Sequence, residues 1–424
     1  MDKILVKSAT LVFPGHDRHG QAVDVLIVNG VVSKVEGGDA IHDEHALTID
    51  GKHQYLSPGF FDLNVNFGEP GLETKETIST GCTAAVAGGY TGLAVQPNTV
   101  PALHSRGEIA MIVNLAKGNL VSVYPIGAIS KNRSGDDLAE LYDMQQAGAV
   151  AFSNGNKSVQ QAGLMSRALL YCKGFEGLVM SYAEDASIAN GAKMNEGITS
   201  TFLGMKGNPN LAEELMVSRD LYLAAYNNAP IHFSTISTKE SVELIRLAKK
   251  KGIKVTCDVA AHHLVLTEES VSGFDSNYKV SPPLRTDDDV KALKDGLLDG
   301  TIDAIVSQHT PHEVEFKKVE FEIAKNGIIG LQTVLPLLLK AGLPVDLIVE
   351  KLAIAPRAIL RLAPPTLAEG SDANFVLFNT EESWTFDAYT NRSKSTNSPY
   401  YGSILKGRVN LVLNNKQVYN SNQE

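Results

Sequence analysis

The chain is poor in several features that define particular classes of protein. Its 424 residues include only three cysteines and one tryptophan, and 48 acidic residues outnumber 38 lysines and arginines, so the formal net charge is −10. The cysteines (Cys82, Cys172 and Cys257) lie far apart and form no C-x-x-C pair, which is typical of core residues in a reducing cytoplasm. The acidic charge argues against nucleic-acid binding and against docking on anionic membranes.

No stretch of the sequence is apolar enough to predict a membrane span or a signal peptide. The start, MDKILVKSATLVF, lacks a long apolar core and a small-residue cleavage site. The most apolar segment, 327–349, is interrupted by two prolines and by Gln332, Lys340 and Asp346, which indicates a buried helix followed by a turn. We therefore expect a cytoplasmic protein.

The middle of the sequence alternates short apolar runs with segments of helical periodicity. Segments 239–250 (KESVELIRLAKK) and 286–298 have the helical pattern. The predicted strands are 59–66, 91–97, 120–126, 148–153, 177–183, 230–235, 252–258 and 302–308. Nearly continuous apolar runs are typical of strands buried on both faces of a parallel sheet. Eight such units favour the α/β class and a (β/α)₈ barrel, which we place at residues 58–365.

The two ends of the chain read as short strands separated by turns. Segments such as AVDVLIVNG before residue 58 and NFVLFN after residue 365 show this pattern. Neither end has enough strands for a stable sheet of its own. The sequence therefore predicts one composite β domain built from residues 1–57 and 366–424.

The ends of the predicted barrel strands lack the residues that would hold a metal. In (β/α)₈ barrels the active site lies at the carboxyl ends of the strands. Zinc is bound there by thiolate, imidazole or carboxylate, and none of the residues at these ends is such a ligand. They are Asn64, Asn66, Asn154, Tyr182, Thr235 and Gln308.

The residue types at these positions limit their orientation and their acid–base chemistry. Asn64 and Asn66 are two apart on one strand, so both should face the lumen. Tyr182 would need a lowered pKa to act as a base, and no strong cation lies near it in sequence. Gln308 cannot accept a proton as a general base does, so His309 and His312 remain the weak candidates for acid–base catalysis.

Other histidines and motifs offer no clear alternative site. His262 and His263 are adjacent on an expected extended segment, so they should face opposite ways and not chelate one ion together. The sequence contains no H-E-x-x-H, no G-x-S-x-G elbow and no Walker loop.

Ordered motifs along nearly the whole chain nevertheless resemble one family. The chain resembles dihydroorotase of the long type, in the amidohydrolase superfamily. The matching segments include SPGFFDLNVNFGEPG (57–71), QPNTVPAL (96–103), YAEDASI (182–188), HHLVLTEE (262–269), SPPLRTDDD (281–289), QHTPHE (308–313) and SPYYGSILKGRV (398–409). The resemblance implies an amidohydrolase-type barrel with a composite β domain.

The same resemblance implies which functions this chain has lost. The family carries His-x-His-x-Arg where this chain has Asn64, Asn66 and Gly68, so two zinc ligands and a carboxylate-binding arginine are absent. The family's bridging acidic residue matches Asn154, its two further metal-binding histidines match Tyr182 and Thr235, and its metal-binding Asp matches Gln308. Ser281 replaces a substrate-contacting Asn, whereas Asn98 and His312 are retained. We therefore expect no zinc and no other cofactor.

Three functions remain open on this basis. The first is a non-catalytic dihydroorotase homologue of pyrimidine biosynthesis that acts as a structural or regulatory partner, for example of aspartate carbamoyltransferase, as in some bacteria. The second is an active dihydroorotase or related cyclic amidohydrolase. The third is a binding module in which Asn64, Asn66, Asn98, Asn154 and Gln308 form a neutral pocket for a pyrimidine-like ligand. Barrels of this kind often form homo-oligomers, which we also expect.

Overall fold

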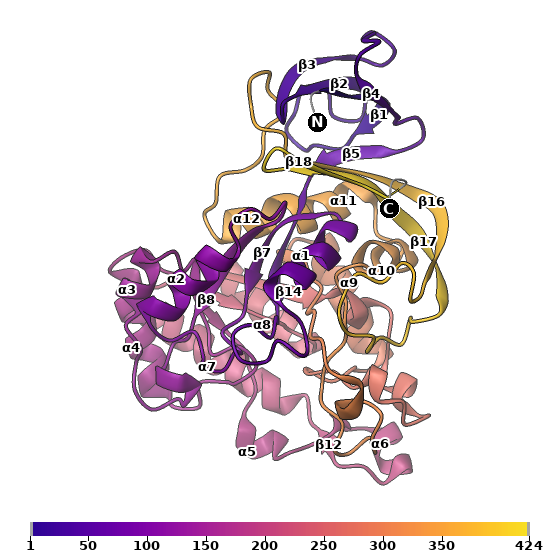
Figure 1. Ribbon diagram of the computed structural model, residues 1–424. Coiled ribbons are helices and arrows are strands. Elements are labelled where there is room, and N and C mark those ends of the chain that lie inside the picture. The colour runs from indigo at the N-terminus through magenta and orange to yellow at the C-terminus, as the bar shows by residue number, and fades with distance from the viewer. Residues whose placement is uncertain (1–2, 422–424) are drawn as a thin grey trace.

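The eight apolar segments of the middle region form a parallel sheet that curls into a barrel (Figure 1). The computed structural model describes residues 3–421. The barrel strands are β6 (Phe60–Val65), β7 (Tyr90–Val95), β8 (Ser122–Gly127), β9 (Ala151–Phe152), β10 (Val179–Ser181), β13 (Ile231–Phe233), β14 (Val255–Ala260) and β15 (Ala304–Val306). Each follows its predecessor in space, and a bridge between Val65 and His309 joins the last strand's exit to the first strand. The predicted (β/α)₈ barrel is confirmed.

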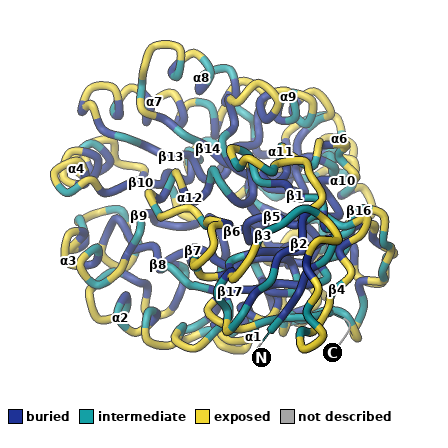
Figure 2. The backbone as a smooth tube through the Cα atoms, turned by 90° about the horizontal axis from the view of Figure 1, so that it is seen from above, coloured by how far each residue is buried: buried dark blue, intermediate teal, exposed yellow. Residues whose placement is uncertain are grey.

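Helices surround the barrel, and Figure 2 shows their exposed outer faces around buried strands. They are α1 (Ile78–Ala87), α2 (Arg106–Leu115), α3 (Leu141–Gln146), α4 (Ala162–Lys173), α7 (Leu211–Asn227), α8 (Lys239–Lys250), α9 (Asp287–Leu298), α10 (Val334–Lys340), α11 (Val345–Val349) and α12 (Ala355–Ile359). The predicted helix 239–250 matches α8, whose N-cap Thr238 accepts a hydrogen bond from the Ser241 amide. Thr286 caps α9 in the same way through the Asp289 amide.

Apolar side chains fill the barrel lumen away from its mouth. Phe61, Leu63, Met180 and Val306 belong to one buried cluster inside it. A much larger cluster lies between the strands and the surrounding helices. Because the lumen is packed in this way, a site inside the barrel itself can form only at the carboxyl ends of the strands.

Both ends of the chain contribute to a second sheet. Its strands are β1 (Lys3–Leu11), β2 (Ala22–Val28), β3 (Val31–Gly37), β4 (Leu47–Asp50), β5 (Tyr55–Pro58), β16 (Phe375–Phe386), β17 (Ser403–Asn414) and β18 (Gln417–Asn420). Strand β16 pairs antiparallel with β5, so distant parts of the sequence meet as neighbours. This sheet lies over the amino ends of the barrel strands (Figure 1). The exact domain boundaries stay a prediction.

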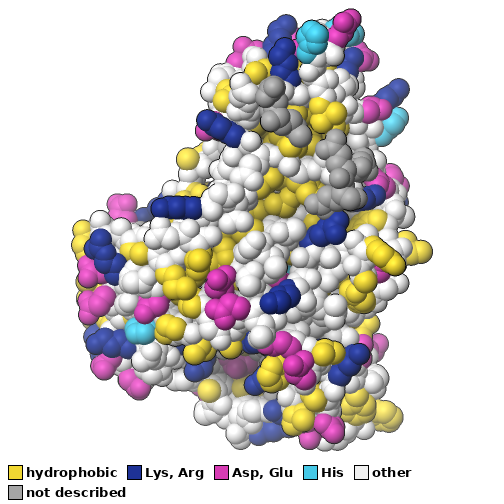
Figure 3. Space-filling view, viewed as in Figure 1, with side chains coloured by type: hydrophobic (Ala, Val, Ile, Leu, Met, Phe, Trp, Pro, Cys, Tyr) yellow, Lys and Arg dark blue, Asp and Glu magenta, His cyan; other side chains and the backbone are white. Residues whose placement is uncertain are grey.

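A small ribbon and two short helices lie at the other end of the barrel. They are α5 (Ala186–Ala189), β11 (Met194–Asn195), α6 (Ile198–Leu203) and β12 (Gly207–Asn208), and β11 pairs with β12. The three cysteines are free and buried. Within residues 3–421 no helix is both long and apolar enough to cross a membrane. The face in Figure 3 carries acidic and basic side chains interspersed, without a continuous basic patch.

Candidate functional site at the barrel mouth

A cavity of about 200 Å³ opens at the carboxyl ends of the barrel strands. We call it the mouth cavity. Six residues predicted from the sequence line it: Asn64, Asn66, Asn98, Tyr182, Ser281 and Gln308. Gln96 and Glu184, which were not predicted, also line it, as does Asn326 at a position where the family resemblance implies a substrate contact. Glu184 is its one charged lining residue among those described, so the cavity has a neutral to negative wall and no lysine or arginine in that wall.

Asn66 and Asn98 form one side of the cavity. The Asn66 amide nitrogen donates to Thr310 Oγ1 at 3.0 Å, and its oxygen accepts from Asn98 Nδ2. Asn98 Oδ1 and Gln96 Oε1 are buried and accept no hydrogen bond from any described residue. An unsatisfied buried acceptor is costly, and the side chains of both residues belong to the cavity wall.

Asn64 lies near Asp258, a buried carboxyl group that does not line the cavity. Its Nδ2 is 3.4 Å from Ser234 Oγ and 3.5 Å from Thr235 Oγ1, both long for hydrogen bonds. Thr235 instead donates to Asp258 Oδ1 at 2.6 Å, and His232 Nε2 lies 2.9 Å from Asp258 Oδ2. Thr235 does not line the cavity, and its hydroxyl serves Asp258.

Tyr182 and Gln308 close the opposite side through Ser281. The Tyr182 hydroxyl is 2.6 Å from Ser281 Oγ, and Gln308 Nε2 donates to the Ser281 carbonyl at 2.8 Å. Burial, with the Glu184 carboxylate nearby, raises the pKa of Tyr182 well above its usual value. Tyr182 is therefore a neutral phenol at physiological pH, neither a base nor a zinc ligand.

Asn154, His309 and His312 lie outside the mouth cavity, unlike the sequence-based expectation for Asn154 and His312. Asn154 turns to Ser130, whose amide donates to its oxygen at 3.1 Å and whose hydroxyl accepts from its nitrogen at 2.9 Å. His309 is buried, with Nδ1 accepting from the Gly330 amide at 3.2 Å and Nε2 at 3.6 Å from Glu76.

His312 lines a separate hollow, with Nε2 at 2.9 Å from the Asn326 carbonyl. Burial lowers the pKa of His312 to about 4, so it is neutral near pH 7. Neither His309 nor His312 therefore presents a free base to the cavity.

The extended segment expected at His262 and His263, with side chains that face opposite ways, is wrong. The two residues lie in a 3₁₀ turn, Ala261–Leu264, and not in an extended segment. Their ring centroids are 4.6 Å apart. Both are buried, and burial lowers the pKa of each, to about 4 for His263.

A buried carboxylate under the mouth was also missed. Asp62 accepts hydrogen bonds from the amides of Asn64 at 2.8 Å and Ser307 at 2.9 Å. Burial raises its pKa to about 7, and Asp258 adds to this effect. The two-residue period of a strand gave no signal for it, because the pairing register of β6 with β7 shifts between Asp62 and Val65.

The donor atoms at the mouth do not match a zinc centre. Across the described part of the chain, no group of three or more His, Cys, Asp or Glu side chains lies where it could hold a metal ion. The atoms that face the cavity are amide, hydroxyl and phenol groups, with Glu184 as the single carboxylate. A pair of divalent cations needs anionic or imidazole ligands to offset its desolvation. The residues present do not fit the zinc that the resemblance implies.

Three comparisons place the chain among known proteins. Residues 53–241 match the family described as Dihydro-orotase-like. A dihydroorotase of Acetivibrio thermocellus is 41% identical, with 98% of each chain covered. A dihydroorotase of Geobacter sulfurreducens is 42% identical over 95% of this chain and 96% of its own. In fold, the chain is similar to L-hydantoinase (dihydropyrimidinase) from Arthrobacter aurescens, with a TM-score of 0.86 at 24% identity over 99% and 96% of the chains.

Proposed function

The chain belongs to the dihydroorotase family of the amidohydrolase superfamily, and on that premise we propose that it binds a neutral cyclic amide at the mouth cavity without hydrolysing it. Its role in pyrimidine biosynthesis would then be structural or regulatory. The observation that carries this proposal is the donor set of the mouth, in which every position matching a family metal ligand bears a neutral side chain. Ring opening in this family depends on a metal-activated water, and the mouth offers no group to generate one.

The charge of the cavity wall supports a neutral ligand over an anionic one. Dihydroorotate carries a carboxylate, and the family arginine for that carboxylate is Gly68 here. The wall contains Glu184 and no cation, so it repels an anion. The amide side chains of the wall, among them Asn64, Asn66 and Asn98, match the ring N–H and C=O groups of uracil or dihydrouracil in chemical type.

An active dihydroorotase is the second candidate, and sequence similarity favours it. Identity of 41–42% over nearly the whole chain is shared with several proteins named dihydroorotase. Taken alone, this similarity supports hydrolysis of a C–N bond in a cyclic amide better than it supports a non-catalytic role. The two candidates make opposite predictions about metal content.

One experiment separates the two candidates. The protein is expressed with added zinc, its metal content is measured, and ring opening of dihydroorotate is assayed beside the Acetivibrio thermocellus dihydroorotase. We expect less than stoichiometric zinc and no turnover. Two bound ions per chain together with turnover would refute the non-catalytic proposal and establish the second candidate.

A rebuilt mouth provides the matched control. The variant carries Asn64→His, Asn66→His, Asn154→Asp, Tyr182→His, Thr235→His and Gln308→Asp, which restores the family's ligand types. We expect this variant to retain zinc where the unaltered chain does not. Ligand binding is measured separately by calorimetry with dihydrouracil and dihydroorotate, and tighter binding of dihydroorotate would contradict the argument from charge.

The proposed partner is aspartate carbamoyltransferase, and self-association is proposed alongside it. Two apolar side chains one turn apart on α6, Ile198 and Phe202, are 88% and 87% exposed and offer a contact surface for such a partner. Size-exclusion chromatography with light scattering should show a homo-oligomer or a complex with the carbamoyltransferase of the same organism. A monomer that does not bind this enzyme at micromolar concentrations would count against assembly.

A further inference from the structure

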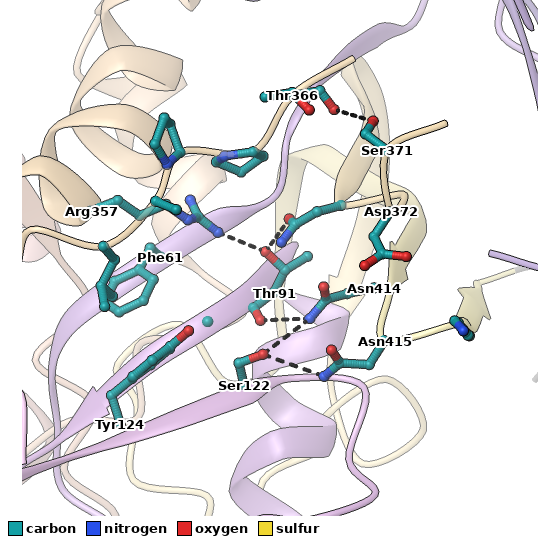
Figure 4. Close-up of a pocket in the computed structure, with 17 residues that line it drawn as sticks. Phe61, Thr91, Ser122, Tyr124, Arg357, Thr366, Ser371, Asp372, Asn414 and Asn415 are labelled. Atoms are coloured by element: carbon teal, nitrogen blue, oxygen red, sulfur yellow. Dashed lines mark hydrogen bonds between the residues drawn. The ribbon is translucent and has the colours of Figure 1, made fainter. Parts of the chain in front are cut away.

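We propose that the chain binds a small oxyanion, a phosphate or carboxylate group, in a second pocket at the opposite end of the barrel. This basal pocket has a volume of about 610 Å³ and lies between the amino ends of β6–β8 and the second sheet (Figure 4). The residues that carry the argument are Phe61, Thr91, Arg357, Asp372 and Lys416, all of which line it. The proposal is independent of whether the mouth cavity hydrolyses, binds or does neither.

Arg357 is a buried arginine in the wall of the basal pocket. Its side chain extends from α12 toward Thr91 in the pocket, as Figure 4 shows, although the residue is only 5% exposed. Burial lowers its pKa to about 10, so it remains a cation at neutral pH. No carboxylate of the described residues forms an ion pair with it. A buried charge without a counter-ion is costly, and most buried charges are paired.

The protein contacts of Arg357 hold it in place without neutralising it. Its guanidinium donates to the carbonyls of Gly59 at 2.8 Å and Ala353 at 2.6 Å, and to Thr91 Oγ1 at 2.9 Å. It also lies over the Phe61 ring, 5.2 Å from the centroid. These contacts use three of the five N–H groups of an arginine, and the remaining donors suit a fork-like contact with an oxyanion.

The charged side chains around the pocket favour a negatively charged ligand. Lys416 lines the pocket, is exposed and forms no ion pair with a described residue, so it adds a second positive charge. Asp372 also lines the pocket and opposes it. The net charge of the wall is therefore positive by one, and an oxyanion is favoured most strongly where it contacts Arg357.

Neutral side chains around Arg357 make the pocket rigid. Thr91 Oγ1 donates to Asn374 Oδ1 at 2.7 Å while it accepts from Arg357. Asn414 donates to the carbonyls of Thr91 at 3.0 Å and Leu120 at 2.7 Å. These bonds connect the C-terminal strands to the barrel, so a ligand here would bridge the barrel and the second sheet.

The test uses inorganic phosphate as the probe and the full chain. Isothermal titration calorimetry at constant ionic strength should show one saturable site per chain. Arg357→Lys should weaken binding about tenfold, because it removes the two-pronged contact. Lys416→Ala should weaken it by a smaller factor, and Asp372→Asn should strengthen it because the opposing charge is gone. Repeating the titration with malonate distinguishes a carboxylate ligand from a phosphorylated one.

A lysine outside the basal pocket provides the control. Lys239→Ala removes an exposed lysine at the start of α8, outside the basal pocket, and should leave phosphate binding unchanged. If Arg357→Lys fails to fold, the opposite effects expected for Lys416→Ala and Asp372→Asn still decide the matter. Absence of saturable binding, or equal affinity in the Lys416→Ala, Asp372→Asn and Lys239→Ala proteins, overturns the proposal.

Discussion

Replacing Arg285 with methionine should destabilise the protein and release the ribbon beside the mouth cavity. The Arg285 guanidinium is 2% exposed and donates to Asn195 Oδ1 at 2.8 Å, the Asn208 carbonyl at 2.9 Å and Ser237 Oγ at 3.0 Å. It also lies 3.7 Å from the carboxylate of Glu213, which is equally buried. Arg285 thus joins β11, β12 and α7.

The expected loss of unfolding free energy depends on how Glu213 is left after the substitution. Methionine has a similar stem, so packing is largely kept, but Glu213 loses the cation beside it. Removing one partner of a buried ion pair costs about 3–5 kcal/mol. Glu213 keeps hydrogen bonds from the amides of Ser237 at 2.9 Å and Thr238 at 3.1 Å, which favours the lower half of that range.

Urea unfolding and hydrogen exchange provide the assay. We expect Arg285→Met to lower the free energy of unfolding by about 3–4 kcal/mol and to speed amide exchange across 194–208. Arg246→Met is the control, because Arg246 is 25% exposed and pairs with Glu243 and Asp299 at the surface. That change should cost about 1 kcal/mol or less. Equal losses for the two variants would refute the reasoning.

The ribbon also connects this prediction to the mouth cavity. Asn208 Nδ2 donates to Glu184 at 3.0 Å, and Glu184 lines the cavity. Release of β12 should therefore alter binding at the mouth as well as stability. The motif SPPLR, which ends in Arg285, is explained here by structure and needs no catalytic role.

Three further predictions concern the mouth. The pKa of Asp62 is raised from 3.8 to about 7, so protonated Asp62 stabilises the fold; this contribution is full below about pH 4 and is lost as the pH rises through 7. Asp62→Asn should remove this part of the pH dependence of the free energy of unfolding, measured in urea. An unchanged pH dependence would show that Asp62 does not contribute to it. Asn98→Ala should weaken dihydrouracil binding about fivefold in calorimetry, since it removes an amide from the cavity wall and the hydrogen bond that orients Asn66. Unchanged affinity would place the ligand elsewhere. Tyr182→Phe should lower the free energy of unfolding by about 1 kcal/mol through loss of the bond to Ser281, and a neutral effect would show that this bond contributes nothing.

The barrel could be predicted because its signals are local. The helical patterns of 239–250 and 286–298 depend on near neighbours, and both helices are observed. Placing Asn64 and Asn66 on one side required only the two-residue period of a strand. That the two ends of the chain share one sheet was expected from the instability of either end alone, whereas the specific pairing of β5 with β16 was not predicted.

The lining of the mouth was less predictable because side chains beyond the strand ends choose among distant partners. Asn154 bonds Ser130 and Thr235 bonds Asp258, and neither partner is near in sequence. The 3₁₀ turn at His262 and His263 likewise brings two rings together that an extended segment would separate.

The amino-acid sequence by itself determined the parallel barrel, the family resemblance and the neutral chemistry at the strand ends, because these depend on residue type and short-range pattern. Tertiary structure alone decided which of those residues face the mouth cavity and that Asp62 is buried against the Asn64 and Ser307 amides. It also decided that Arg357 has no counter-ion among residues 3–421. Burial and hydrogen-bond partners come from segments far apart in the chain, and only the folded arrangement brings them within contact distance.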